Sequence, residues 1–501
     1  MSQTLWILIF VQMMMGAFDT VYHHEGTQRL AWRPEQATEL RLHGVRNLAY
    51  ALMFMALGWG EPHGIWAIAL IALLAGELFI TLWDFVEEDR SRQLPATERV
   101  THTLLTLNYG AILALLLPLL TGWAARPTAI LPVYHGVMNW FCLIAAVGVV
   151  ISGLRDLAAA RRCPRLAPTD AATLATPLMG RWRVLVTGGT GFIGSRLVEA
   201  LARAGHEVIL LTRGRAKAAP LALTGRVRVV VSLDEIAADE RIDAIVNLAG
   251  EPISDSPWTR AKRIRIVRSR LAVTYGVLRL IRRLEHKPGV LVSGSAIGIY
   301  GVRGDETLRE GDGGTPCFSQ RVCASWERAA LRAEALGVRT VLLRTGLVLD
   351  SSGGMLGRML APFEFGLGGR FGNGWHWMSW IHRDDLVRLI VHFLITSTLE
   401  GPVNGTAPEP VTNRGFTAAL GRALGRPALV PIPGWPLRMA LGAFAEELLL
   451  AGQRVLPKAA LDSGFAFLYP DIDTALTTIT GRRPKEARPD RTPVLQMRSH
   501  A

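Results

Sequence analysis

Long apolar stretches separated by short polar segments occupy the first 155 residues of the chain. Several of them approach the roughly 20 residues that an α-helix needs to cross a bilayer, although the first two are short. We therefore predict an all-α transmembrane domain over residues 1–155 with about five spans. The apolar stretches lie at about 3–19, 45–60, 64–86, 103–123 and 136–153.

Basic residues are distributed unevenly between these stretches. Arginines follow the first, third and fifth stretches, whereas the intervening loops carry only Arg126. Positively charged loops stay on the cytoplasmic side of a membrane. The first stretch lacks the basic segment and cleavage site of a removable signal peptide. We therefore predict a multi-pass protein of the inner (cytoplasmic) membrane whose C-terminal part is cytoplasmic. The arginines that support this orientation are Arg29, Arg33, Arg41, Arg46, Arg90, Arg92, Arg99, Arg155, Arg161, Arg162 and Arg165.

A different pattern begins after residue 155. Residues 156–180 are rich in Ala, Arg, Pro and Thr, which predicts a linker with little fixed structure. From residue 181 onward, short apolar strands alternate with amphipathic helices, a pattern typical of a parallel sheet joined by crossover helices. We predict an α/β domain over residues 181–485, followed by a tail at 486–501.

A glycine-dense turn follows the first of these strands and opens an amphipathic helix at 195–204. Its glycines have the spacing G-x-x-G-x-x-G, which suits a sharp turn, close approach of the backbone to a pyrophosphate, and tight packing of helix on strand. The helix N-terminus offers free N–H groups to phosphate. This context favours a dinucleotide-binding Rossmann turn over an ordinary β–α turn. The predicted cofactor residues here are Gly188, Gly191, Phe192, Ile193 and Gly194.

The second strand ends in Thr212 and Arg213, where an NAD-binding site usually carries an acidic residue. An arginine can pair with a 2′-phosphate instead, so we predict NADP(H), with NAD(H) as the alternative cofactor. The competing interpretation is a solvated basic turn. Two later strand ends are expected at the same ligand-binding edge of the sheet. They carry Asn247, Leu248, Ala249 and Gly250, expected beside the ribose, and then Ser293 and Ser295.

The motifs at 187–194, 247–250 and 293–301 resemble those of extended short-chain dehydrogenases/reductases. More closely, residues 183 to about 485 are similar to the atypical, epimerase-like branch of that superfamily. Further segments that carry this resemblance lie at 343–349, 377–386, 404–408 and 452–457.

The resemblance implies an α/β Rossmann fold with a doubly wound parallel sheet and a small C-terminal substrate lobe from about residue 345. It also implies NADP(H) binding and an epimerase-like activity on a small, nucleotide-sugar-like substrate. For residues 1–155 we recognise no family.

One departure from the family pattern bears on catalysis. The acid/base pair of the superfamily is Tyr-x-x-x-Lys, on the helix that follows the serine strand. Phe318 and Val322 stand at these positions, and neither side chain can transfer a proton. Because hydride transfer belongs to the cofactor, a reductase remains one interpretation, and a domain that binds nucleotide without turnover is the other. The remaining catalytic candidates are Ser295, Tyr300 and His382.

Two of the polar residues beyond the serine strand carry alternative interpretations. His382 precedes Asp384, so it is either a proton donor or a structural partner of that carboxylate. Arg344 is either a contact for an anion or a buried partner of Asp384.

Histidines and carboxylates recur at the predicted cytoplasmic side of the bundle. Glu-x-x-x-His pairs begin at Glu39 and Glu98, and this spacing places both members on one helix face. Imidazole and carboxylate together suit iron, zinc or manganese, and helical bundles hold di-metal sites. The alternative is a solvated rim whose acids offset arginines, and the spacing is one residue longer than in ferritin-like sites. The candidate metal ligands are His24, Glu25, Glu39, His43, Glu98 and His102.

Composition narrows the class of protein. Half of the 501 residues are apolar and 19% are charged, and the mean hydropathy is +0.25, which favours a membrane part. The net charge of +13 fits positive loops plus a phosphate site; we expect no nucleic-acid partner, because the basic residues are dispersed. The four cysteines form no C-x-x-C pair and predict neither a disulfide framework nor a cysteine zinc site.

Three functional hypotheses follow from these patterns. The first is a membrane-anchored NADP(H)-dependent oxidoreductase or epimerase-like protein that acts on an unknown small molecule. The second is a non-catalytic protein that senses NADP(H) or serves as a scaffold. The third is electron transfer from NADPH to a metal in the membrane bundle. The lipid bilayer and a small-molecule substrate are the expected partners, and the oligomeric state stays open.

Overall fold

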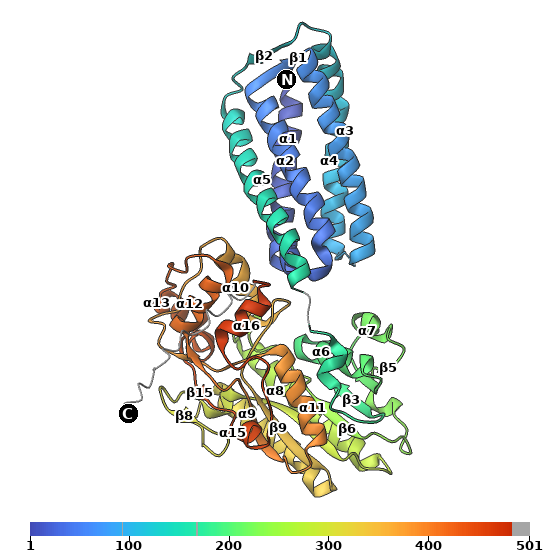
Figure 1. Ribbon diagram of the computed structural model, residues 1–501, viewed down its shortest axis with the longest axis vertical. Helices are drawn as coiled ribbons and strands as arrows, with labels where there is room; N and C mark the ends of the chain where they lie inside the picture. Colours follow the sequence, from blue (N-terminus) through green and yellow to red (C-terminus); the bar gives the residue numbers. More distant parts are fainter. Residues whose placement is uncertain (93, 167–168, 483–501) are drawn as a thin grey trace, which may run out of the picture. The chain divides into compact units, whose positions relative to one another are not determined.

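A computed structural model describes residues 1–92, 94–166 and 169–482, and the chain separates into two compact units between residues 167 and 168 (Figure 1). The first unit is a helical bundle, and the second is an α/β domain. The predicted tail at 486–501 lies outside the described residues.

The first unit is built from long helices. After α1 the chain continues as a π-helix, η1 (Asp19–Gln28). At the opposite end of the bundle, β1 (Gly60–His63) pairs antiparallel with β2 (Ala129–Pro132) (Figure 1). The long helices are α1 (Gln3–Phe18), α2 (Ala37–Trp59), α3 (Ile65–Ser91), α4 (Ala96–Ala124) and α5 (Val137–Arg162).

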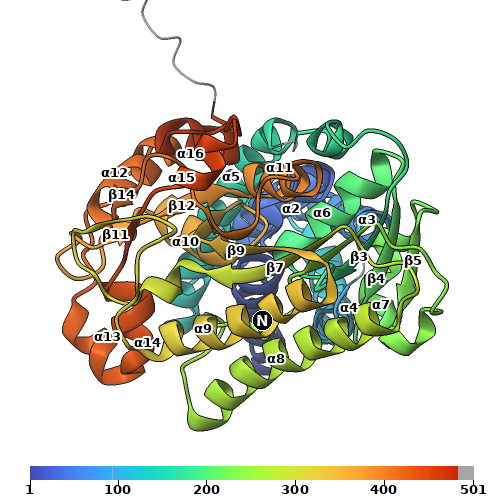
Figure 2. The ribbon, with the colours of Figure 1, turned by 90° about the horizontal axis from the view of Figure 1, so that it is seen from below.

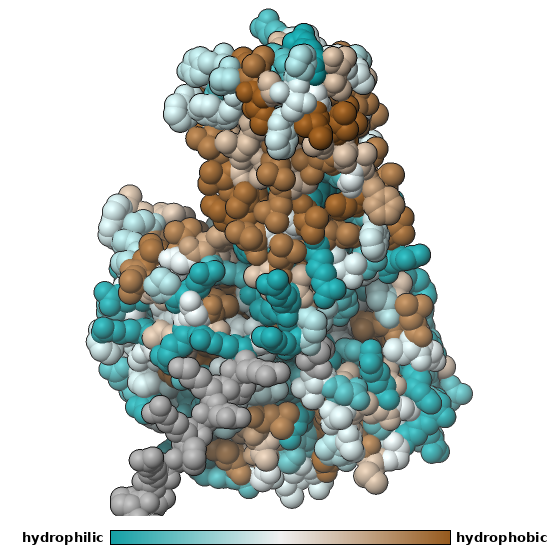
Figure 3. Space-filling model, turned by 45° about the horizontal axis from the view of Figure 1, so that its top comes forward, coloured by the Kyte–Doolittle hydropathy of each residue, from teal (hydrophilic) through white to brown (hydrophobic). Residues whose placement is uncertain are grey.

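Among the described residues, four helical segments are long and apolar enough to cross a membrane, against the five predicted spans. These segments contain α1, α3, α4 and α5. α2 is not one of them, because its first turns carry polar side chains, of which Glu39 and His43 are buried in the bundle. On the face of the bundle seen in Figure 3, hydrophobic side chains form a broad band. Exposed apolar residues of the bundle include Leu52, Phe79 and Ile144. An apolar surface of this extent marks a membrane or protein contact.

Two glycines allow α2 and α5 to pack closely. A Cβ atom on Gly44 would lie 2.6 Å from Leu157 Cγ, and one on Gly153 would lie 2.9 Å from the carbonyl oxygen of Gly44. Small residues at such crossings let helix backbones approach each other. A larger side chain at either glycine would therefore push α2 away from α5.

The second unit contains, within the described residues, a seven-stranded parallel sheet with the order β13-β9-β7-β6-β3-β4-β5. The chain leaves β3 toward one edge and returns to β6 on its other side, so the order reverses between β3 and β6. This reversal is the point at which Rossmann-type sheets bind ligands. The strands are β3 (Arg183–Thr187), β4 (Glu207–Leu211), β5 (Val227–Val230), β6 (Ala244–Asn247), β7 (Val290–Ala296), β9 (Arg339–Thr345) and β13 (Gly401–Gly405).

Alternate residues of each strand face opposite layers of helices. Val184 and Val186 pack with α6 and α11 in one core, whereas Leu185 packs with α8 in the other. Figure 2 shows α6 and α11 on one side of the sheet and α8 and α9 on the other. Burial on both faces explains why the strands read as continuous apolar runs. The helices that cover the sheet are α6 (Phe192–Arg203), α8 (Arg260–Arg283), α9 (Phe318–Ala330) and α11 (Arg383–Ile395), and α7 (Arg215–Ala222) follows β4.

The structure differs from the linker predicted at 156–180. α5 continues to Arg162, and a 3₁₀ turn, η5 (Ala171–Ala175), packs against α6 and α11. Leu174 and Leu178 are buried in the sheet core. The prediction rested on the overall composition of this stretch, which does not show that a few apolar side chains anchor it to the sheet core.

The C-terminal lobe predicted from about residue 345 is interrupted, because α11 and β13 return to the main sheet. Short strands pair as β10–β12, β11–β14 and β15–β8. The strands are β8 (Thr307–Leu308), β10 (Leu347–Leu349), β11 (Trp377–Met378), β12 (Trp380–His382), β14 (Val411–Thr412) and β15 (Arg454–Val455). The helices are α10 (Gly354–Glu364), α12 (Asn413–Leu424), α13 (Gly434–Leu441), α14 (Ala443–Ala445), α15 (Lys458–Asp462) and α16 (Ile472–Ile479).

Candidate functional site

The glycine turn between β3 and α6 lies where the strand order reverses. Gly188 has φ +71°, a conformation that favours glycine, and a Cβ there would lie 2.7 Å from the backbone of Leu248. A Cβ on Gly194 would lie 2.3 Å from the carbonyl oxygen of Gly188. Gly191 precedes α6 in extended conformation, and no side chain caps the helix. The free N–H groups of the first helical turn therefore remain available to a phosphate.

The side chains of Phe192 and Ile193 both take part in packing. The ring of Phe192 lies so close to Gly353 that a Cβ there would be 2.7 Å from it. Ile193 packs against the sheet core. Because both side chains are apolar, the hydrogen-bond donors that these two residues offer to a phosphate are their backbone N–H groups.

The end of β4 presents an exposed guanidinium. Arg213 is exposed and forms no hydrogen bond or ion pair with any residue that the structure describes. Its neighbour Arg215, by contrast, contacts Glu235 at 3.3 Å. The hydroxyl of Thr212 is bonded to the backbone of Gly214. Arg213 is therefore the cation at this strand end that is open to an anionic ligand.

Asn247 holds two elements together. Its Oδ1 accepts a hydrogen bond of 2.7 Å from Thr187, and its Nδ2 donates one of 3.0 Å to Thr274 on α8. The Thr187 hydroxyl also accepts from the backbone N–H of Ala249 at 3.3 Å. The side chain of Asn247 is thus bonded within the protein, and the placement of residues 247–250 beside a ribose stays a prediction.

The residues that follow Asn247 lie close to the glycine turn. Leu248 packs partly against the sheet core. Gly250 faces Arg270, whose guanidinium carbon would lie 3.1 Å from a Cβ at this glycine. Arg270 is held by the backbone carbonyls of Glu251 and Ile266 at 3.0 Å. Burial lowers the pKa of its guanidinium below the usual value.

Ser295 and Tyr300, predicted as catalytic, belong to one buried network. The hydroxyl of Ser295 donates to Glu327 at 2.6 Å, and Glu327 accepts two hydrogen bonds from Arg344. Arg344 also donates to the Tyr300 hydroxyl at 3.1 Å, which in turn donates to Asn404 at 2.7 Å. Burial raises the pKa of Tyr300, which is fully enclosed. Both hydroxyls are therefore engaged in structural bonds.

The partner of Arg344 also differs from the one predicted. Its carboxylate partner is Glu327, whereas Asp384 pairs with Arg196 at 2.8 Å. Arg196 lies 188 residues before Asp384, so no local pattern connects the two. Paired in this way, Arg344 is not available as an anion contact.

His382 caps a helix. Its Nδ1 accepts a hydrogen bond of 3.1 Å from the backbone N–H of Asp384, at the start of α11, and its ring lies 3.9 Å from that of Tyr469. Burial lowers its pKa. The structural interpretation of His382 thus accounts for its contacts, and the proton-donor role does not.

The hydroxyl of Ser293 is a buried exception. Its Oγ has no hydrogen-bond partner among the described residues, although the residue is fully enclosed in β7. Nothing in the structure explains this unpaired hydroxyl.

The positions of the family's tyrosine and lysine lie at the start of α9. Phe318 contacts Trp258 with ring centroids 4.8 Å apart, and Val322 is buried in the same cluster. The carboxylate of Glu447 accepts hydrogen bonds from the backbone N–H groups of Phe318 and Ser319 at 3.2 and 2.9 Å. This apolar packing leaves no proton donor at the two positions.

A cysteine next to this network is also inert. Cys323 lies one residue beyond Val322 and is buried. Burial raises the pKa of its thiol to about 12, so it stays protonated at neutral pH.

Five of the six predicted metal-ligand residues gather at one end of the bundle. His24, His43, Glu39, Glu98 and His102 all take part in close carboxylate–histidine groups there. Glu25 does not, because it forms an ion pair with Arg155. Sequence reasoning missed Asp19 and Glu88 as members of these groups, although Asp19 stands four residues before a histidine. Among the described residues there are three such groups, and within each group the candidate ligand atoms lie within 4.8 Å of one another.

Comparison with known proteins identifies the family to which the second unit is similar. A profile of the NAD dependent epimerase/dehydratase family matches residues 184–404, and one for a domain of unknown function (DUF1731) matches residues 432–479. Epimerase family protein YfhF of Bacillus subtilis is 38% identical over 306 residues, which cover 60% of this chain and 98% of that protein. Human epimerase family protein SDR39U1 is 37% identical over 303 residues, 59% of this chain and 99% of the relative.

Solved structures agree with these matches. The crystal structure of human SDR39U1 (isoform 2) with NADPH aligns at a TM-score of 0.55 and 35% identity, over 60% of this chain and 99% of that one. UDP-glucose 4-epimerase with UDP-glucose from Thermotoga maritima aligns at a TM-score of 0.50 and 18% identity, over 60% of this chain and 97% of that one, and so shares the fold. Both profile matches lie in the second unit.

Proposed function

This chain belongs to the NAD dependent epimerase/dehydratase family, and we propose that its second unit is an NADP(H)-binding oxidoreductase or epimerase-like domain carried by a membrane-anchoring bundle. The observation that carries the cofactor assignment is Arg213, exposed and unpaired among the described residues at the end of β4. A related human structure contains NADPH, which supports the same assignment.

The residues of the glycine turn fit a pyrophosphate. Side chains larger than hydrogen are excluded at Gly188 and Gly194, so the backbone stays open to close approach at Gly191. The first N–H groups of α6 would bind the pyrophosphate, and Arg213 would pair with the 2′-phosphate. NADPH, when bound, supplies a hydride. The protein's part is to bind and orient it.

The two positions at which the superfamily carries its acid/base pair hold no proton donor in this chain. Phe318 and Val322 cannot titrate, and the hydroxyls of Ser295 and Tyr300 are bonded inside the protein. We therefore favour hydride transfer to a small, nucleotide-sugar-like acceptor that takes its proton from solvent. The same bonds favour a second candidate, a domain that senses NADP(H) or acts as a scaffold without turnover.

The membrane orientation is part of the proposal. The end of the bundle that holds η1 also carries most of its arginines, and the other end carries Arg126. By the positive-inside rule the first end faces the cytoplasm. The chain leaves the bundle there after α5, so the nucleotide domain would meet cytoplasmic NADPH.

The test uses the full chain in lipid nanodiscs. NADPH and NADH are titrated separately by protein fluorescence, and the absorbance of the reduced nicotinamide is then followed over time. Selective NADPH binding with slow oxidation is the expected result. Tight binding without oxidation, with candidate sugar nucleotides present, would favour the sensor. Failure to bind either nucleotide would overturn both candidates.

A further inference from the structure

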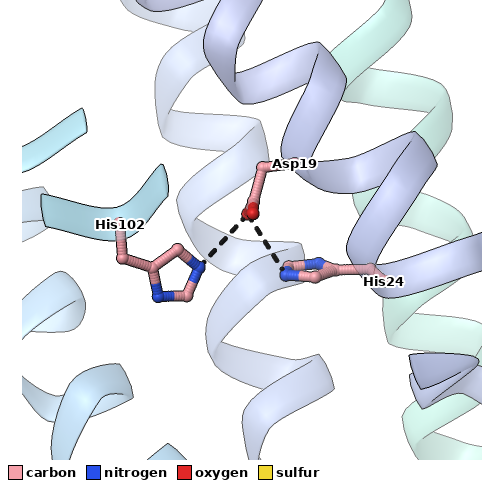
Figure 4. A group of neighbouring side chains, drawn as sticks. All are labelled: Asp19, His24 and His102. Atoms are coloured by element: carbon pink, nitrogen blue, oxygen red, sulfur yellow. Dashed lines mark hydrogen bonds and ion pairs between the residues drawn. The ribbon is translucent and has the colours of Figure 1, made fainter. Parts of the chain in front are cut away.

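We propose that Asp19, His24 and His102 bind a divalent transition-metal ion at the η1 end of the helical bundle. The Nε2 atoms of His24 and His102 each lie 3.3 Å from the same oxygen, Oδ2 of Asp19. Figure 4 shows both rings pointing at that carboxylate from different elements, His24 from η1 and His102 from α4. Three ligand atoms therefore converge on one point, independently of the nucleotide domain.

The π-helix explains how one segment supplies two of the ligands. A π-helix closes its hydrogen bonds between residues five apart, so residue i+5 returns to the face of residue i. In η1 that pair is Asp19 and His24. The π-helical turn brings both His23 and His24 to the Asp19 carboxylate, whereas in an α-helix only the residue four positions after Asp19 would share its face. π-helices are rare and frequently occur at functional sites, so the π-helical conformation of η1 supports a binding site here.

One of the three ligand atoms has no hydrogen bond. His24 is 92% buried, and its Nε2 has no hydrogen-bond partner among the described residues, although it points at Asp19. A buried polar atom without a partner is costly, and a metal ion at the convergence point would supply one.

The other polar atoms of the same residues are already oriented. His23 Nδ1 lies 2.9 Å from Oδ1 of Asp19, which leaves Oδ2 for the metal. His102 Nδ1 lies 3.4 Å from Oε2 of Glu88, which leaves Nε2 for the metal. Carboxylate partners of this kind fix the ring orientation of metal-binding histidines.

Charge also favours a cation here. Among the described residues, the ion pairs around this point join five carboxylates to two guanidinium groups, so these groups carry an excess of negative charge when the histidines are neutral. A divalent ion would reduce that excess. The carboxylates are Asp19, Glu39, Asp84, Glu88 and Glu98, and the guanidinium groups belong to Arg46 and Arg92.

Two of these carboxylates are already neutralised by an ion pair with Arg92. Its guanidinium contacts Glu39 at 2.9 Å and Glu98 at 2.8 Å. Asp84 is likewise paired with Arg46 at 2.8 Å. Asp19 has no arginine partner among the described residues, so it is the carboxylate left to a metal ion.

The ligand set indicates the class of ion. Two imidazoles and one carboxylate suit first-row divalent metals and leave coordination positions open, an arrangement typical of non-haem iron(II). We therefore expect iron(II) to bind, and cobalt(II) to serve as its optical probe.

The test loads the full chain in nanodiscs with iron(II) without oxygen, removes loosely bound metal by dialysis, and measures metal per protein by mass spectrometry. We expect about one equivalent in the unaltered protein, and at least about a tenfold loss in His24→Gln and His102→Gln. The control is His63→Gln, at the other end of the bundle beside β2, which should retain the metal. Helix content by circular dichroism and monodispersity by size-exclusion chromatography, measured on the same samples, show that the bundle of each variant folds.

A measurement on the unaltered protein covers the case in which the variants fail to fold. Addition of cobalt(II) should give visible d–d absorption that saturates near one equivalent, and pulsed electron paramagnetic resonance should detect coordinated imidazole nitrogen. The proposal is overturned if the unaltered protein retains no metal, or if both histidine variants retain as much as His63→Gln. Neither result would touch the nucleotide assignment, which rests on the other unit.

Discussion

Arg344 on β9 and Glu327 on α9 form a two-pronged ion pair, with Nε to Oε1 at 2.9 Å and Nη2 to Oε2 at 3.0 Å. Both side chains are about nine-tenths buried. The same carboxylate accepts the hydroxyl of Ser295. The pair therefore engages the hydroxyl of Ser295, a predicted catalytic candidate, and it links the sheet to a helix.

Glu327→Gln should destabilise the second unit, because it leaves the Arg344 guanidinium buried without its counter-charge. We expect a loss of about 3 kcal/mol in the free energy of unfolding. Denaturant titration of the full chain, followed by tryptophan fluorescence, measures it. The matched control is Glu306→Gln, since Glu306 pairs with Arg303 at the surface, where solvent screens the pair, and its loss should change the free energy of unfolding far less. Equal effects of the two changes would contradict the structural role of the buried pair.

Arg213→Ala should weaken NADPH binding about tenfold or more and leave NADH binding unchanged, because only NADPH carries the 2′-phosphate. Parallel titrations by protein fluorescence measure both affinities. Arg228→Ala serves as control, since Arg228 lies on β5 and pairs with Glu240. A similar loss for both nucleotides would show that Arg213 acts on the fold of the turn rather than on the phosphate.

Gly194→Ala should abolish tight dinucleotide binding, because the new Cβ would lie 2.3 Å from the Gly188 carbonyl oxygen and force the turn open. We expect a loss of stability of about 1–3 kcal/mol as well, typical of overpacking. Gly311→Ala, with nothing within 4 Å of its Cβ, should change neither property. Calorimetric titration with NADPH and thermal unfolding test the two effects together. Unchanged binding in Gly194→Ala would rule out the assigned turn.

His382 predicts a pH dependence. Burial lowers its pKa, so the unfolded chain takes up a proton at a higher pH than the folded one. Its contribution to stability is present above the ordinary histidine pKa and is lost as the pH falls below it. Compared with His382→Asn, which can still cap α11, the unaltered protein should lose more stability between pH 7 and pH 5. The slope is at most about 1.4 kcal/mol per pH unit. Parallel denaturation curves at several pH values measure the difference, and identical slopes would contradict it.

Features of this chain that depend on neighbouring residues could be predicted from its sequence. The glycine turn is read from seven consecutive positions between a strand and a helix, because the conformation of such a turn depends on the residues within it. Arg213 and the apolar helices are local in the same sense. The parallel sheet and the family membership were therefore predictable, and both are confirmed.

The use of the remaining polar side chains was decided by tertiary structure. Asp384 pairs with Arg196 from 188 residues away, and Glu327 takes the hydroxyl of Ser295 and the guanidinium of Arg344 together. No spacing rule connects such residues, because a buried charge is satisfied by whichever partner the fold brings near. The packing of α4 beside η1 likewise brings His102 to Asp19, 83 residues apart. The sequence by itself determined which groups are present and their local conformation, while folding determined which of them meet.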